Sequence, residues 1–286
     1  MANVLRTEKR AAVVAALVEG NSIRATCRMT GVAKNTVTRL LVELGEACSE
    51  FQNETLRGLP CRRLRLEVDE IWGFCYAKAK NVPAEKRGQF GYGDVWTFTA
   101  IDAETKLVPC WLVGSRDAGC ATEFMQDLAG RLANRVQLTT DGHSMYVSAV
   151  EDTFGAGIDY AQLVKIYGSD PEAEKRYSPA VCIGCKPAVV QGDPDPFAIS
   201  TSYVERSNLT MRMSMRRLTR LTNAFSKKVE NLAAAVSLNF MHYNFVRPHR
   251  SLRTEKDNRV TPAMAAGIAR RPWSIAEIVG LLGSRS

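Results

Sequence analysis

The sequence predicts an α/β fold, in which a small all-helical domain precedes a mixed sheet flanked by helices. Two observations predict it. Apolar residues recur at helical spacing up to residue 44, whereas strand-like and helix-like runs alternate from residue 64 onward. With 286 residues, 45% of them hydrophobic, the chain can bury a core of ordinary size beside a small domain. We expect a helical domain at 1–50, a linker at 51–63, the α/β domain at 64–250 and a helical tail at 251–286.

Three helices are expected in the N-terminal domain. The first covers residues 8–18, and residues 19–22 break it, with Ser22 as the N-cap of a second helix over 23–29. A tight turn at residues 30–32 leads to a third helix over 33–44, whose inward side chains are Val37, Leu40, Leu41 and Leu44. Polar side chains near the start of this helix face outward: Lys34, Asn35, Thr36, Thr38 and Arg39.

This pattern is typical of a helix-turn-helix, whose recognition helix places its N-terminal side chains against base edges in the major groove of DNA. Small helical triplets also serve as dimerisation modules. The glycine in the turn, Gly31, and the polar residues after it favour DNA binding.

The middle of the chain alternates between strand-like and helix-like runs. Strands are expected at 64–68, 95–101 and 107–113, the last two joined by a turn at 102–106 that contains Asp102. A helix over 122–133, a strand over 136–140, a helix over 144–154 and a strand over 160–166 follow. A hairpin followed by helices and further strands predicts a mixed sheet with helices packed on it.

Three short segments, EVDEIW, LTTDGH and SYVERSN, place Asp69, Asp141 and Glu205 at the edges of apolar or helical runs. The first two segments close strand-like runs, and the third opens a helix-like run. Side chains that leave the ends of neighbouring strands converge, and Mg²⁺ prefers oxygen ligands from a few carboxylates, water and phosphate. The sequence therefore predicts that Asp69, Asp141 and Glu205 are both catalytic and metal-binding, in a site for phosphoryl transfer.

The net charge of +8 is uneven, because residues 1–63 carry +4, residues 64–202 carry −6 and residues 203–256 carry +8. Basic surfaces attract phosphate backbones. In the helix expected from Tyr203, Glu205 and Asn208 share one stripe with three arginines, and apolar side chains gather on another face. A solvated helix face would also explain this stripe, but its single sign favours DNA contacts through Arg212, Arg216 and Arg220.

The order Asp69, Asp141, Glu205, together with the tail YNFVRPHRSL at residues 243–252, resembles the DDE transposases of bacterial insertion sequences, which are relatives of retroviral integrases. The TDG and VER contexts and the YN-x-x-RPH-x-x-L tail carry this resemblance, which covers most of the chain. It implies an RNase H-like catalytic core. Glu205 follows Asp141 by 64 positions, a wider gap than in many members of the family, so we expect an insertion at about 155–200.

The resemblance implies a transposase that binds the ends of its element and catalyses metal-dependent DNA cleavage and strand transfer. In such a site, two divalent ions activate the attacking oxygen and stabilise the leaving oxygen. Asp69 would contact both ions, and Asp141 and Glu205 one each, while water and then a 3′-hydroxyl attack. We expect Mg²⁺, with Mn²⁺ as a substitute, and double-stranded DNA as partner. Synapsis of two ends implies a homo-oligomer in the active complex.

Other polar residues receive different interpretations. Glu70 should point to the opposite strand face from Asp69, and aspartate is common at turns, so Glu70 and Asp102 are expected to be structural. His143 is a candidate neighbour of the active site, although a polar residue at a helix start has a simpler role. Three residues of the tail motif have two alternative roles: they bind DNA, or they fasten the last helices to the core. These residues are Arg247, His249 and Arg250.

The pair Cys182 and Cys185 has the inner spacing of a zinc half-site, and a redox role is the other functional alternative. A structural zinc needs four ligands, and the sequence offers no second pair to complete them. We therefore expect an incidental pair and no zinc.

Two rival functions share these features: a non-catalytic helix-turn-helix regulator derived from a transposase, and a structure-specific metal-dependent nuclease. The acidic triad argues against the first, and a sequence-reading helix-turn-helix against the second. No apolar run approaches the roughly 20 residues that span a bilayer. Eight scattered cysteines without an export signal are best explained as reduced thiols. We expect a bacterial cytoplasmic protein associated with the nucleoid, with no membrane partner.

Overall fold

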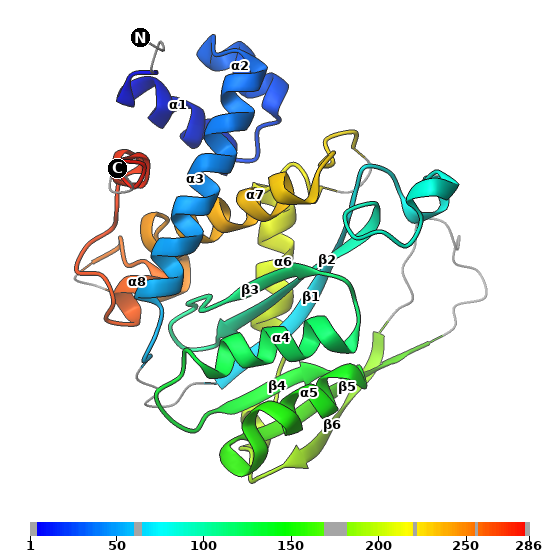
Figure 1. The fold of residues 1–286 in the computed structure, drawn as a ribbon. Coiled ribbons are helices and arrows are strands. Elements are labelled where there is room, and N and C mark those ends of the chain that lie inside the picture. The colour runs from blue at the N-terminus through cyan, green and yellow to red at the C-terminus, as the bar shows by residue number, and fades with distance from the viewer. Residues whose placement is uncertain (1–4, 60–64, 169–181, 220–221, 255–256, 284–286) are drawn as a thin grey trace.

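A computed structural model describes residues 5–59, 65–168, 182–219, 222–254 and 257–283. Its centre is one six-stranded sheet with the order β3-β2-β1-β4-β5-β6 (Figure 1). The strands are β1 (Arg65–Cys75), β2 (Gly93–Asp102), β3 (Trp111–Gly114), β4 (Gln137–Asp141), β5 (Asp159–Tyr167) and β6 (Cys182–Gln191). Strands β1, β2 and β3 form an antiparallel meander, and β4 and β5 run parallel to β1. This mixed sheet confirms the predicted α/β fold with an RNase H-like core.

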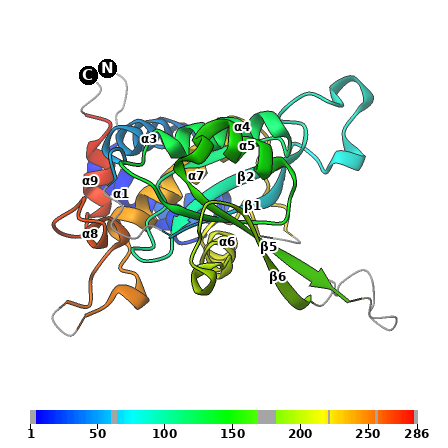
Figure 2. The same cartoon turned by 90° about the horizontal axis from the view of Figure 1, so that it is seen from below.

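Helices cover both faces of the sheet. Helices α4 (Ala118–Ala129) and α5 (Met145–Phe154) lie on one face, and α6 (Ser202–Ser214) lies on the other (Figures 1 and 2). Phe98 of β2, Phe124 of α4 and Tyr146 of α5 belong to the core on the first side. The second core contains Ile71 of β1, Val204 of α6 and Phe240 of α7 (Val229–Met241). Asp69 and Glu70 therefore lie on a strand that is covered on both faces.

The N-terminal region contains three helices, α1 (Thr7–Val18), α2 (Ile23–Thr30) and α3 (Lys34–Thr55). Ser22 caps α2 as predicted, since its side chain accepts from the N–H of Ala25 at 3.1 Å. Gly31 ends α2 with a φ of 69°, in the left-handed region that favours glycine. The four predicted inward residues of α3 are buried: Val37, Leu40, Leu41 and Leu44. The helix-turn-helix function of this region stays a prediction.

Helix α3 is longer than the sequence predicted, because it continues past Leu44 to Thr55, over residues assigned to the linker. Its second half packs on α7. A Cβ on Gly45 would lie only 2.4 Å from Cα of Ala234, so the two helices cross at a point that only glycine permits. Gln52, further along α3, is buried and donates to the carbonyl oxygen of Ser237. This packing supplies the apolar and polar contacts that extend the helix.

One apolar core joins the N-terminal helices to the C-terminal part of the chain. It includes Val14 of α1, Leu41 of α3 and Leu238 of α7, together with Phe245 and Ile278. The C-terminal helices are α8 (Pro262–Ala265) and α9 (Ile275–Gly280), and α9 lies beside α1. Shorter helical turns are Ala79–Asn81, Ala84–Lys86, Gly155–Gly157, Pro196–Ala198 and Arg250–Leu252, with a π-helical turn at His242–Val246. Within the described ranges, no helix has both the length and the apolar character needed to cross a bilayer.

Several predicted boundaries are wrong. Strand β1 does not end at Val68, because its antiparallel pairing with β2 carries it to Cys75. Strand β3 begins only at Trp111, and the expected long helix from Tyr203 ends at Ser214. The chain leaves α6 there because Met215 and Leu218 turn into the core beneath β1.

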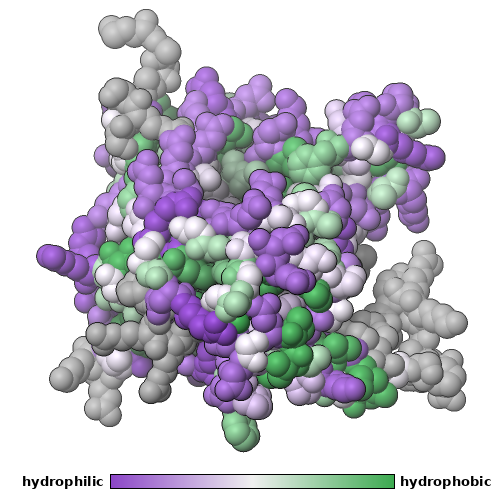
Figure 3. All heavy atoms as spheres, turned by 60° about the horizontal axis from the view of Figure 1, so that its bottom comes forward, coloured by the Kyte–Doolittle hydropathy of each residue, from purple (hydrophilic) through white to green (hydrophobic). Residues whose placement is uncertain are grey.

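The expected insertion at about 155–200 contains β5 and β6, and β6 adds an antiparallel edge strand to the sheet. Figure 3 shows apolar side chains gathered low on the molecule, where β5 and β6 lie. The exposed apolar side chains of these two strands are Val164, Ile166, Ile183, Val189 and Val190. Among the described strands, β6 pairs with β5 alone, and an edge strand with apolar side chains is a surface on which another chain can pair.

Candidate functional site

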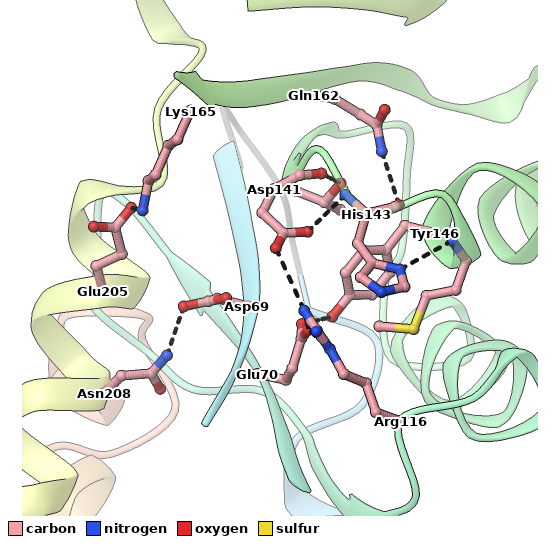
Figure 4. Close-up of polar contacts among 12 residues, drawn as sticks. Asp69, Glu70, Arg116, Asp141, His143, Tyr146, Gln162, Lys165, Glu205 and Asn208 are labelled. Carbon is pink, nitrogen blue, oxygen red and sulfur yellow. Dashed lines mark hydrogen bonds and ion pairs between the residues drawn. The ribbon is translucent and has the colours of Figure 1, made fainter. Parts of the chain in front are cut away.

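Asp69 and Asp141 lie close together, directly after the last paired residues of β1 and β4. The two strands pair in parallel up to Val68 and Thr140, after which β4 ends at Asp141 while β1 continues. Oxygen atoms of Asp69, Glu70 and Asp141 lie within 4.8 Å of one another (Figure 4). The two aspartates predicted for the site are thus brought together by the end of a strand pair, and Glu70 joins them.

Both oxygens of Glu70 are held by neighbouring side chains. Arg116 donates from Nε to Oε1 at 2.5 Å, and the Tyr146 hydroxyl donates to Oε2 at 2.6 Å. Arg116 also reaches toward Asp141, with 3.9 Å between Nη2 and Oδ2, and its guanidinium lies over the ring of Trp96. Glu70 therefore fixes Arg116, a cation that borders the carboxylate cluster. The structural role expected for Glu70 is compatible with these contacts.

The carboxyl group of Asp69 is perturbed by its surroundings. Its pKa is raised to about 7, mainly by burial and in addition by the neighbouring charges of Glu70 and Asp141. On the α6 side, Nδ2 of Asn208 donates to Oδ2 of Asp69 at 2.8 Å. The side-chain oxygen of Asn208, Oδ1, is buried and has no hydrogen-bond partner among the described residues. The cluster thus holds excess negative charge and a spare oxygen acceptor beside it.

Helix α6 is anchored to β1 by Glu67. One oxygen of this buried carboxylate, Oε2, accepts from the backbone N–H groups of Tyr203 at 2.7 Å and Val204 at 3.0 Å. These N–H groups belong to the first turn of α6, where the helix dipole favours a negative charge. Burial raises the pKa of Glu67, and the two backbone bonds oppose that shift. Glu67 therefore fixes the position of the helix that carries Glu205 and Asn208.

Glu205 lies on α6, three residues before Asn208, on the side of the gap opposite Asp141 (Figure 4). Its carboxylate pairs with Nζ of Lys165 on β5 at 2.6 Å and accepts a hydrogen bond from the Thr201 hydroxyl. The structure therefore does not place Glu205 within the 4.8 Å cluster, but at the rim of the same gap. Its catalytic role stays a prediction.

His143 shapes the turn between β4 and α5. Its backbone N–H donates to Oδ1 of Asp141 at 3.0 Å, and its ring Nδ1 accepts from the N–H of Met145 at 3.3 Å. Gln162 of β5 donates to its carbonyl oxygen. These contacts support the helix-start role and also fix the carboxylate of Asp141.

Two groups of predicted DNA-binding residues line one groove, which has a volume of about 1030 Å³. Lys34, Asn35, Thr38 and Arg39 border it from α3, and Arg216 borders it from the segment after α6. Thr36 instead lines a second hollow, with Arg39, on the side of α1. Arg216 lies beyond the end of α6, so the continuous arginine stripe expected on one helix is wrong at this position. Arg212 lies on α6 and donates to the carbonyl oxygen of Leu218, and Arg220 lies outside the described residues.

The remaining residues singled out by the sequence have local contacts. Asp102 accepts from the N–H groups of Glu104 and Thr105, the turn role expected for it. His249 donates from its backbone to Val260 and bonds through its ring to Ser251, whereas Arg247 and Arg250 are exposed. The sulfur atoms of Cys182 and Cys185 lie 3.9 Å apart at exposed positions.

Sequence reasoning missed four residues that shape the site: Glu67, Arg116, Tyr146 and Lys165. Glu67 lies in the segment EVDEIW, but strand alternation gives no sign that it caps a helix far along the chain. Arg116 and Lys165 follow or lie in strands as isolated cations, and no spacing rule connects them to the carboxylates. These contacts join residues 40 to 137 positions apart, so only the folded chain reveals them.

The fold and the site define an RNase H-like protein with a carboxylate cluster suited to a divalent cation. The chain matches no family model and no curated protein. It is similar to solved transposase complexes. The Mos1 strand transfer complex is 13% identical with a TM-score of 0.25, and the match covers 56% of this chain and 59% of that chain. A piggyBac transposase synaptic complex with hairpin DNA is 10% identical with a TM-score of 0.41, and the match covers 98% of this chain and 72% of that chain. A pre-cleavage Mos1 transpososome is 9% identical with a TM-score of 0.21, and the match covers 56% of this chain and 60% of that chain. The chain spans less than two thirds of the Mos1 chains. The functional assignment rests on the geometry of the site.

Proposed function

We propose that this chain is a DDE transposase of a bacterial insertion sequence, which binds the ends of its element and catalyses metal-dependent DNA cleavage and strand transfer. The observation that carries the proposal is the convergence of Asp69 and Asp141 at the end of β4, with α6 facing them across the gap. Asp69 and Asp141 come from adjacent parallel strands and Glu205 lies on the facing helix, and these positions support the proposal.

The residues present fit a hard divalent cation. The donor set consists of carboxylate oxygens, which Mg²⁺ and Mn²⁺ prefer over nitrogen or sulfur. Burial and the neighbouring charges of Glu70 and Asp141 raise the pKa of Asp69, and a bound cation would stabilise its charged form. The unpaired oxygen of Asn208 offers a further acceptor for a bound water. When bound, the metal supplies charge neutralisation at the attacking and leaving oxygens of a phosphodiester.

Each neighbouring residue has a distinct task in this proposal. Asp69 and Asp141 hold the metal, and Asn208 keeps the Asp69 carboxylate turned toward the gap. Arg116, fixed by Glu70, lies beside Asp141 and balances part of its charge. Glu205 would add a third carboxylate for the cation if it released Lys165, whose ammonium group would then be available to a substrate phosphate.

Double-stranded DNA is the proposed partner, held by the helix-turn-helix and by the basic residues that follow α6. Lys34, Asn35 and Arg39 are exposed at the start of α3, as a recognition helix requires. Synapsis of two element ends needs a homo-oligomer, and a bacterial nucleoid supplies the substrate.

The test is cleavage and joining of labelled duplexes that carry the DNA flanking this gene, with Mg²⁺ or Mn²⁺. We expect metal-dependent strand transfer by the native chain and loss of cleavage, with end binding retained, in Asp141→Asn. The exposed residue Asp152, changed to Asn, provides the matched control and should remain active. Binding without cleavage by the native chain with both metals would favour the regulator, and full activity of Asp141→Asn would remove Asp141 from the site.

A further inference from the structure

The connection between β1 and β2 projects from the sheet as an arm. It consists of residues 76–92, which we refer to as the arm, and it contains two short helical turns, Ala79–Asn81 and Ala84–Lys86. Figures 1 and 2 show it in cyan, extending away from the body of the molecule in both views. No residue of the arm belongs to the carboxylate cluster or to the N-terminal helices, so the fold and the site leave its role open.

The arm is basic although it lies in an acidic part of the chain. Residues 64–202 carry a net charge of −6, whereas the arm has one acid, Glu85, and four cations: Lys78, Lys80, Lys86 and Arg87. Three of these cations are exposed and form no ion pair with a carboxylate among the described residues: Lys78, Lys80 and Arg87. Neighbouring cations without counter-charges repel one another and attract a polyanion.

Contacts within the arm hold it in one shape. The rings of Tyr76 and Tyr92 meet edge to face with their centroids 5.1 Å apart, and Nζ of Lys86 lies 4.5 Å and 4.9 Å from these two centroids. Val82 is only 3% exposed, and its carbonyl oxygen accepts from Nε of Arg87 at 3.2 Å. A fixed arm loses little conformational entropy when it binds a partner, which favours affinity.

The base of the arm packs on the segment that leads into α7. The N–H of Tyr76 donates to the carbonyl oxygen of Ser226 at 2.9 Å. A Cβ on Gly91 would lie 3.2 Å from Cγ1 of Val229, so the two segments touch at both ends of the arm. Two exposed lysines lie between these contact residues: Lys227 and Lys228. The cations of the arm therefore have further cations beside them, and such an extended basic surface suits a polyanion better than a local acidic patch.

Strand β1 joins the arm to the carboxylate cluster. Asp69 lies in this strand, and the arm begins at Tyr76, seven residues further on. With a rise of about 3.3 Å per residue, this part of β1 is roughly 23 Å long. DNA rises about 3.4 Å per base pair, so a duplex that runs along β1 covers this length with about seven base pairs. One short duplex can therefore reach both the cluster and the arm.

We propose that the arm binds the phosphate backbone of double-stranded DNA whose phosphodiester lies at the carboxylate cluster. Lysine and arginine side chains hold phosphates without reading the base sequence, so the arm positions DNA and does not select it. The inference rests on the proposed function for the identity of the polyanion, and it adds a contact that the helix-turn-helix and the residues after α6 do not supply. A second copy of this chain is the alternative partner that the experiment excludes.

The test measures binding of the full chain to fluorescent duplexes of about 30 base pairs by anisotropy in EDTA, over a range of salt concentrations. The arm variant is Lys78→Gln with Lys80→Gln, both at exposed positions. The matched control is Arg253→Gln with Arg270→Gln, which removes the same charge from exposed positions in the C-terminal part of the chain. Figure 2 shows that part, in orange and red, on the other side of the molecule from the arm. Lys78→Arg with Lys80→Arg keeps the charge, and thermal unfolding shows that each protein is folded.

We expect the arm variant to weaken duplex binding about tenfold and the control less than about twofold. The slope of log K against log salt should fall in magnitude by about 1.8, since each phosphate contact contributes about 0.9. The loss should be the same for the DNA flanking this gene and for an unrelated sequence, and the arginine variant should restore binding.

Equal affinities of the arm variant and the control would overturn the proposal. Light scattering gives the mass of each protein in solution, and a lower mass of the arm variant with unchanged DNA affinity would assign the arm to a second copy instead. Because EDTA prevents cleavage, these outcomes are independent of the strand-transfer assay. A chain that shows the arm effect but never cuts refutes the proposed function alone, and one that cuts without an arm effect refutes this inference alone.

Discussion

Asn208 on α6 donates a hydrogen bond of 2.8 Å to Asp69 on β1, and this single contact joins the helix behind the sheet to the carboxylate cluster at its centre. The amide lies three residues after Glu205, so it fixes the helix in the register that points Glu205 at the same gap. Asp69 thus has Asn208 on one side of its strand, while Arg116 and Glu70 pair on the other.

Asn208→Ala should weaken Mn²⁺ binding about 10- to 100-fold, because groups that orient a ligating carboxylate typically contribute that much to metal affinity. Isothermal titration of the metal-free chain with Mn²⁺ measures the affinity of each variant. Leu209→Ala is the matched control, since Leu209 is the next residue of the same helix and is exposed. Unchanged Mn²⁺ affinity in Asn208→Ala would show that Asp69 needs no orientation from α6.

Asp69→Asn should stabilise the metal-free protein at pH 8 and have little effect near pH 4. The folded-state pKa of Asp69 is about 7, whereas its ordinary value is 3.8, so the unfolded chain binds fewer protons between these values. Stability from this group is therefore present below about pH 4 and is lost as the pH rises through 7. The gain at pH 8 is of the order of 1–3 kcal/mol, as one pKa unit corresponds to about 1.4 kcal/mol.

Thermal unfolding in EDTA between pH 4 and pH 8 tests whether Asp69→Asn stabilises the protein as the pH rises. Asp152→Asn, at an exposed position of α5, is the control and should show no comparable pH-dependent gain. If Asp69→Asn destabilised the protein more at pH 8 than at pH 5, the carboxylate would be stabilised in the fold and the crowding of charge at the site would be disproved.

Glu67→Ala should lower the free energy of unfolding by about 1–3 kcal/mol, because it leaves the N–H groups of Tyr203 and of the buried Val204 without their acceptor. Strand cleavage should fall as well, since α6 carries Asn208 and Glu205. Urea unfolding and the cleavage assay measure the two effects. Glu67→Gln keeps one acceptor oxygen and should recover part of both. The exposed Glu151, changed to Ala, should leave stability within about 0.5 kcal/mol of the native value.

Asn244→Asp should destabilise the fold by at least about 2 kcal/mol at pH 7. The fully buried amide of Asn244 accepts from the N–H of Val108 and donates to the carbonyl oxygen of Val108. A carboxylate would keep the first bond but face the carbonyl oxygen without a proton. The loss should shrink at low pH, where the new carboxyl group is protonated.

Urea unfolding at pH 7 and pH 4 measures the stability lost in Asn244→Asp. Asn81→Asp, at an exposed turn, is the control. Asn244 belongs to the YN-x-x-RPH tail that marked the family resemblance. A neutral effect on stability would contradict the structural role that the two hydrogen bonds to Val108 give Asn244.

Alternation and helical spacing were sufficient to locate most elements. Helices α1 and α2, strands β2, β4 and β5, and helix α5 all lie within a few residues of their expected ranges, because each buries one face of a regular pattern. The sequence failed where tertiary contacts set the boundary. The length of β1 comes from its pairing with β2, and the length of α3 from the close crossing of Gly45 and Ala234.

The sequence by itself determined the fold class and predicted that Asp69 and Asp141 lie near the ends of neighbouring strands, because both carboxylates follow short apolar runs. It also determined that the ends of the chain are basic and the middle acidic. Tertiary structure decided the rest: that Glu70 holds Arg116, that Glu67 anchors α6, that Glu205 pairs with Lys165, and that the N-terminal helices share a groove with Arg216. The physical reason is that local patterns record which face of an element is buried, whereas the partner across the fold depends on packing between distant segments.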